Sequence, residues 1–106
     1  MSFPKFLRSL KQDEVPAGLE VPLQSLWQAG RDKWDEAHRL VQDDSSTDAA
    51  WVHAYLHRQE GDVGNADYWY ARAGQQRPAV SLEKEWEAIS CELLNRADHS
   101  DCDNDH

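Results

Sequence analysis

Two segments of this chain carry the same arrangement of apolar side chains, and the second follows the first at an offset of 29 positions. Within each segment the apolar positions recur with the three- and four-residue spacing of one helix face. A tight polar turn divides both segments at the same place. The pattern therefore predicts two helical hairpins of one design. The matched pairs are Leu23/Val52, Leu26/Tyr55, Trp27/Leu56, Trp34/Val63, Ala37/Ala66, Leu40/Trp69 and Val41/Tyr70.

The limits of the helices are indicated by residues that start or stop them. Pro22 suits a first helical turn, and Ser81 suits an N-cap. Gly61 and Gly74 suit the left-handed residue that follows a helix. No segment alternates apolar and polar residues over a strand length, so we expect an all-α fold without a sheet. The expected helices span residues 22–30, 34–43, 48–60, 63–73 and 82–95, and the last of these caps the two stacked antiparallel hairpins.

A length of 106 residues is enough for one domain with a modest core. We expect the helical-hairpin domain to occupy residues 20–96. Residues 1–19 form an N-terminal arm, which is predicted to be either a short helix opened by Pro4 or a mobile segment. Residues 97–106 carry four Asp and no basic side chain, and we expect this acidic tail to be disordered.

The charge of the chain excludes some classes of partner. Twenty acidic residues against eleven basic ones give a formal net charge of −9. This charge repels phosphate backbones and anionic lipids, so we expect neither nucleic-acid nor membrane binding. No run of about 18 apolar residues is present. Two cysteines are too few for a secreted disulfide scaffold, so we expect reduced thiols and a cytoplasmic location.

Residues 61–73 resemble the turn and second helix of tetratricopeptide and Sel1-like repeats. Those families place Gly-Asp at the turn, Ala early in the second helix, and an aromatic pair followed by a basic residue and Ala. Residues 32–37 resemble the same turn, and residues 50–58 resemble a group of small, uncharacterised proteins that share this hairpin. The resemblance implies two stacked hairpins that present a groove to a peptide or partner protein. It departs from the tetratricopeptide pattern in its shorter period and in having two units.

We therefore predict a protein-interaction or scaffold module, with a protein or peptide partner and no cofactor. Tyr, Trp and Arg dominate the energetics of protein interfaces. Trp34 begins a helix beside a turn, and Tyr68 and Arg72 share a helix face away from the core. The alternative for the latter two is ordinary local packing of an Arg side chain over a Tyr ring. The predicted partner-binding residues are Trp34, His53, His57, Arg58, Tyr68 and Arg72.

A second hypothesis is a small metal-dependent or acid–base enzyme. His53 and His57 are four residues apart on one helix, which is the spacing of a two-His metal site. His38 would supply a third imidazole if the hairpins stack suitably, and Glu60 or Asp35 would orient the rings. The alternative is that these histidines are solvated or half-buried on the polar side of a helix, and on that interpretation we assign no metal ligand and no catalytic residue.

Two further alternatives concern other parts of the chain. An open end of the hairpin stack would allow a second copy to bind, giving a homodimer. Cys91, His99, Cys102 and His106 include potential zinc ligands, but they lack the close Cys pair with which zinc sites usually begin. We interpret this second set as a solvated tail with adventitious metal affinity at most.

Overall fold

The computed structural model describes residues 1–99, with side chains up to Arg96, and this part of the chain contains α-helices and no strand. The predicted all-α class is confirmed. None of the helices in the described range is long and apolar enough to cross a membrane. The helices are α1 (Phe3–Ser9), α2 (Val21–Gly30), α3 (Trp34–Gln42), α4 (Thr47–Gln59), α5 (Val63–Ala73) and α6 (Leu82–His99).

The predicted helix limits differ from the observed ones mainly at α6. This helix continues through His99, so the prediction that it ends near residue 95 is wrong. The rest of the predicted tail, residues 100–106, lies outside the described residues. The N-cap of α4 is Ser46, whose hydroxyl accepts a hydrogen bond from the Ala49 amide at 3.1 Å. This helix therefore begins slightly earlier than the polar loop suggested.

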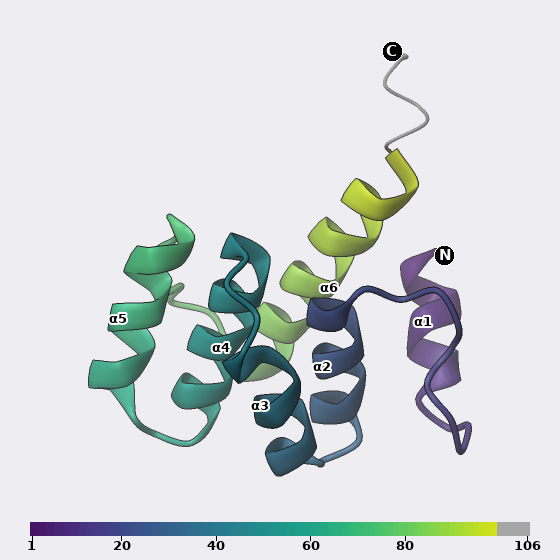
Figure 1. Cartoon of the computed structure of the whole chain (residues 1–106), viewed down its shortest axis with the longest axis horizontal. Helices are drawn as coiled ribbons and strands as arrows, with labels where there is room; N and C mark the ends of the chain where they lie inside the picture. Colours follow the sequence, from purple (N-terminus) through teal and green to yellow (C-terminus); the bar gives the residue numbers. More distant parts are fainter. Residues whose placement is uncertain (100–106) are drawn as a thin grey trace.

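Helices α2 and α4 form the centre of the molecule (Figure 1). Helices α3 and α6 each pack against both of them, α5 packs against α4, and α1 packs against α6. As a result, α5 lies at one end of the molecule and α1 at the other (Figure 1). The N-terminal arm is thus attached to the core through α1. Phe6 of α1 is fully buried and stacks on Trp86 of α6 with ring centroids 5.8 Å apart.

The 29-residue offset is present in the backbone as well as in the sequence. Helices α2 and α4 end at equivalent positions, and α3 and α5 begin at equivalent positions. Between them, Asp32 and Gly61 occupy the same place and both have positive φ, 63° and 88°. Glycine adopts this conformation without a steric penalty, and Asp tolerates it better than most residues. The two turns are therefore built alike.

Small side chains lie where the helices of each hairpin cross. Ala54 of α4 and Ala66 of α5 are both fully buried in one small cluster. The equivalent residues of the first hairpin are Ser25 and Ala37, and the Ser25 hydroxyl donates to the Ala37 carbonyl at 2.7 Å. Small residues let two helix axes approach closely. The predicted role of Ala66 at the crossing is consistent with this packing.

Three tryptophans tie the helices together through their indole N–H groups. Trp27 donates to the Ser9 hydroxyl at 3.0 Å, which joins α2 to α1. Trp34 donates to the Leu56 carbonyl at 2.9 Å, which joins α3 to α4. Trp86 donates to the carbonyl of Leu26 at 2.8 Å, which joins α6 to α2. Each indole therefore contributes apolar area to the core and also satisfies its polar atom.

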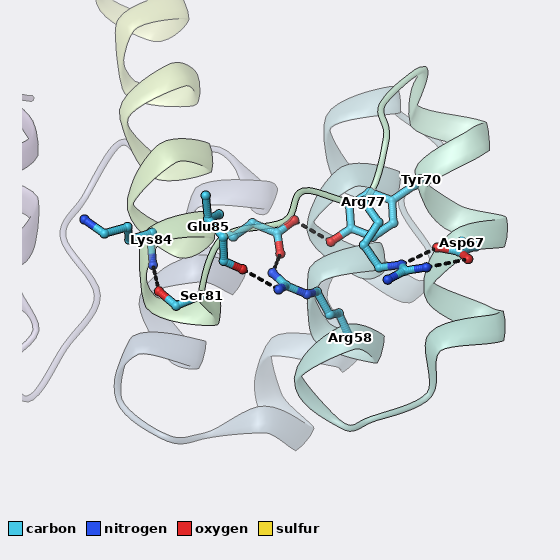
Figure 2. Close-up of polar contacts among 8 residues, drawn as sticks. Arg58, Asp67, Tyr70, Arg77, Ser81, Lys84 and Glu85 are labelled. Carbon is cyan, nitrogen blue, oxygen red and sulfur yellow. Dashed lines mark hydrogen bonds and ion pairs between the residues drawn. The ribbon is translucent and has the colours of Figure 1, made fainter.

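A buried carboxylate holds α4, α5 and α6 together (Figure 2). Glu85 of α6 is 2% exposed. One of its oxygens accepts a hydrogen bond from Arg58 of α4 at 2.7 Å, and the other accepts from the Tyr70 hydroxyl of α5. Arg58 also donates to the Val80 carbonyl. The charge of Glu85 is thus paired and hydrogen-bonded, which is the condition for burying a carboxylate without a large penalty.

Removing the Tyr70 hydroxyl is expected to destabilise the fold. In Tyr70→Phe, Glu85 loses one donor while remaining buried, and a hydrogen bond to a charged group contributes about 1.5–3 kcal/mol. Urea unfolding followed by tryptophan fluorescence should show a lower midpoint with an unchanged slope. The matched control is Tyr68→Phe, because Tyr68 is 55% exposed and should unfold like wild type within about 0.5 kcal/mol. Equal stability of the two variants would contradict the proposed role of Tyr70.

Candidate functional site

Three histidine side chains from two helices meet between α3 and α4. His53 and His57 are one turn apart on α4, so their rings lie on one face of that helix and stack with centroids 4.9 Å apart. His38 of α3 approaches both, at 4.7 Å from His53 and 5.5 Å from His57. The Nε2 atoms of His38 and His53 are 3.0 Å apart. We call these three residues the histidine triad.

Two tryptophans stack on the histidine triad. Trp34 precedes His38 by one turn of α3, and the two rings are nearly parallel with centroids 4.8 Å apart. Trp69 of α5 stacks on His53 at 4.0 Å. The position of Trp34 is itself fixed, because its N–H donates to the Leu56 carbonyl. The indole rings therefore restrict the orientation of two of the three imidazoles.

Burial keeps the inner histidines uncharged. His53 is 4% exposed, and burial together with the neighbouring His38 and His57 lowers its pKa to about 4. Burial and His57 also lower the pKa of His38 below its usual range. At neutral pH each of these two rings is consequently uncharged and has one nitrogen without a proton. The interpretation that the histidines lie solvated on the polar side of α4 is wrong for His53, because α3 and α5 cover that side of the helix.

The distances within the histidine triad suit a transition-metal ion. Each ring offers a nitrogen, and the three nitrogens lie within 4.8 Å of one another. Zn–N bonds of about 2.0–2.1 Å place two tetrahedral ligand atoms roughly 3.4 Å apart. The nitrogen–nitrogen distances in the triad lie between 3.0 Å and 4.8 Å, a range that includes this value.

An acidic group lies beside the histidine triad on the solvent side. A Glu60 carboxylate oxygen is 3.6 Å from Nδ1 of His57, a buried atom that has no hydrogen-bond partner within the described residues. Asp62 is also near His57, but its carboxylate caps α5 by accepting from the backbone and side-chain amides of Asn65. Of the two acidic residues considered from the sequence, Glu60 therefore lies beside His57, and its role in orienting the ring stays a prediction.

The six residues predicted to bind a partner are divided by the structure into separate groups. Trp34, His53 and His57 belong to the cluster between α3 and α4. Arg58 points away from it and is ion-paired with Glu85. The exposed outer face of α5 carries the remaining two, Tyr68 and Arg72.

Two of the residues around these sites were not identified from the sequence as parts of them. Trp69 was assigned to the core, but it is only half-buried and covers His53. Glu85 was not assigned, although it lies three residues after Leu82 and four before Ile89, both on the inward face of α6. That spacing was the signal for a buried carboxylate. Cys91 is half-buried on α6, and the side chains of the other residues in its Cys/His set lie outside the described residues.

Comparisons with protein-family models, curated proteins and solved structures gave no significant match. The resemblance to tetratricopeptide and Sel1-like repeats therefore stays a prediction. What the structure adds is the internal equivalence of the two hairpins, which rests on helix ends and turn conformation.

The burial of His53 predicts how stability depends on pH. The unfolded chain protonates this ring near pH 6.5, whereas the folded chain does so near pH 4. Between these values the unfolded state binds more protons, so the free energy of unfolding falls as the pH drops through 6.5 towards 4, and this ring makes it level only above about pH 7.5. Chemical unfolding at a series of pH values measures this slope, and His53→Gln should flatten it. An NMR titration in which the His53 ring protonates near pH 6.5 would contradict the prediction.

Proposed function

We propose that this chain is a small helical domain that binds a divalent transition-metal ion, such as Zn²⁺, through His38, His53 and His57. The observation that carries the proposal is the convergence of three imidazole nitrogens from two helices within 4.8 Å. Imidazole suits Zn²⁺, Cu²⁺ and Ni²⁺, whereas Ca²⁺ and Mg²⁺ prefer oxygen ligands. Metal binding requires neutral rings, and the lowered pKa values of His38 and His53 favour that form.

The surroundings of the histidine triad support this proposal. Metal-ligating histidines are commonly held by a second layer of contacts that fixes ring orientation. Here Trp34 and Trp69 stack on two of the rings, and the Glu60 carboxylate faces the third. The metal-dependent enzyme considered from the sequence would use the same three histidines. Metal binding is the part of that hypothesis that the geometry supports.

Metal binding is tested by titrating metal-free protein with Zn²⁺ in a calorimeter and measuring bound metal. We expect one ion per chain, and stabilisation against unfolding by about 2.7 kcal/mol when free Zn²⁺ is 100 times its dissociation constant. His38→Gln and His57→Gln should each weaken binding by more than roughly 100-fold, which exceeds the usual effect of losing an orienting contact. Circular dichroism verifies that both variants remain folded.

The matched control replaces the two histidines outside the triad. A His99→Gln, His106→Gln double variant should bind Zn²⁺ as wild type does. If this control loses binding while His38→Gln and His57→Gln retain it, the ion is held by the C-terminal segment and the proposal is wrong. Absence of any stoichiometric binding would also refute it.

We propose in addition that the outer face of α5 contacts a protein partner. Helix α5 packs against α4 at one end of the molecule, so its far side is uncovered (Figure 1). Tyr68 is exposed there, and Arg72 lies over the rings of Tyr68 and Trp69 without an ion pair among the described residues. A hollow of about 200 Å³ adjoins Trp69 and Arg72 beside the loop between α3 and α4. Tyr and Arg are residue types that dominate protein interfaces, which favours a protein partner here, while Asp43 and Asp44 at the hollow favour a basic group on that partner.

This second proposal is tested by affinity capture from the native cell. We expect a Tyr68→Ala, Arg72→Ala double variant to lose at least one partner that wild type recovers. Lys84→Ala provides the control, because Lys84 is an exposed residue of α6 away from α5. Equal recovery by all three proteins would remove the site hypothesis for this face.

A further inference from the structure

The histidine triad supplies three ligands, and this number bears on what a bound ion could do. Structural zinc sites are closed by four protein ligands, whereas sites with three protein ligands leave a position for water or another molecule. The group that converges here consists of His38, His53 and His57, and no fourth His, Cys, Asp or Glu among the described residues lies within the same 4.8 Å of all three. The number of protein ligands is therefore that of zinc sites that leave one coordination position for water or another molecule.

Glu60 is the described side chain closest to filling a fourth position, and its location argues against that role. Its carboxylate lies beside Nδ1 of His57 and belongs with His57 and Asp62 to a separate group of potential ligands. The side chain is also half exposed, so holding it at an ion would require ordering it. A carboxylate beside the non-ligating nitrogen of a metal-bound histidine is the usual orienting arrangement, and Glu60 takes that place when the ion binds His57 through Nε2.

The exposure of the triad indicates which side an added ligand would reach. His53 is buried beneath Trp69, whereas His38 and His57 are partly exposed, with 14% of the His57 side chain accessible. Solvent thus meets the triad at His38 and His57. Three neutral imidazoles would not neutralise a divalent ion, so a small anion or hydroxide is favoured at the remaining position over a neutral ligand.

We infer that an ion held by the histidine triad keeps one coordination position open towards solvent, where a small anion or a water molecule binds directly to the metal. This inference rests on the proposed metal binding and adds the class of ligand that the site accepts. Glu60 acts in it as a positioning residue for His57. An open position of this kind is what allows a bound ion to polarise a ligand or lower the pKa of its water.

The test uses Co²⁺ as a spectroscopic probe and azide as the added ligand, with the full chain in a chloride-free buffer. The visible bands of protein-bound Co²⁺ report its coordination. We expect azide to change this spectrum along a single-site saturation curve. An unchanged spectrum at high azide, with Co²⁺ still bound, would overturn the inference and leave metal binding intact. If Co²⁺ does not bind at all, metal binding itself fails.

Glu60→Gln decides whether a protein carboxylate closes the site. If Glu60 only positions His57, the variant should have the wild-type Co²⁺ spectrum before azide is added. Its half-saturating azide concentration should lie within about twofold of the wild-type value, and its affinity for Co²⁺ should be about 10–100-fold weaker. If Glu60 is a ligand, wild type should resist azide and the variant should respond to it, which would overturn the inference. Glu87→Gln, an exposed change on α6, provides the control and should match wild type throughout.

Discussion

The packing of α4 against four other helices is the constraint on which this structure depends. Helices α2, α3, α5 and α6 all contact it, so most of its side chains must suit a neighbour. Fully buried Ala54 allows the close approach of α5, and Leu56 fills the main core. Arg58 near its C-terminal end reaches α6. Because nearly every face of α4 is covered, polar residues on this helix need partners within the protein.

The polar residues of α4 meet that requirement in two different ways. The charge of Arg58 is fully paired within the protein. It forms an ion pair with Glu85, and the Tyr70 hydroxyl donates to the other oxygen of that carboxylate (Figure 2). The ring nitrogens of the histidines, in contrast, are only partly hydrogen-bonded. The His53 ring makes one polar contact, with His38, and Nδ1 of His57 has no hydrogen-bond partner among the described residues, although a Glu60 oxygen lies 3.6 Å away. A buried network that is fully satisfied stabilises a fold, whereas a partly satisfied one requires an explanation, and the proposed metal ion is one that the convergence of the three rings supports.

The candidate metal site and the outer face of α5 are connected through Trp69. One side of this ring covers His53, and the Arg72 guanidinium lies over the indole at 5.4 Å. Tyr68 packs edge-on against the same indole. A partner that displaced Arg72 would therefore act on the residue that shields the innermost histidine. The two proposed functions thus involve adjoining parts of the molecule, which meet at Trp69.

The sequence alone determined the helices and turns of the two hairpins and their equivalence, because these follow from local spacing and from residues such as Gly61 that act within a few positions. It also indicated that His53 and His57 share a helix face. Only the tertiary structure decided that His38 meets them, that Trp69 covers His53, and that Glu85 is buried. The first two outcomes depend on how α3 and α5 pack around α4, which brings together residues whose separation along the chain carries no local signal. The spacing of Glu85 on α6 did indicate an inward position, but its partners Arg58 and Tyr70 follow only from the packing of three helices.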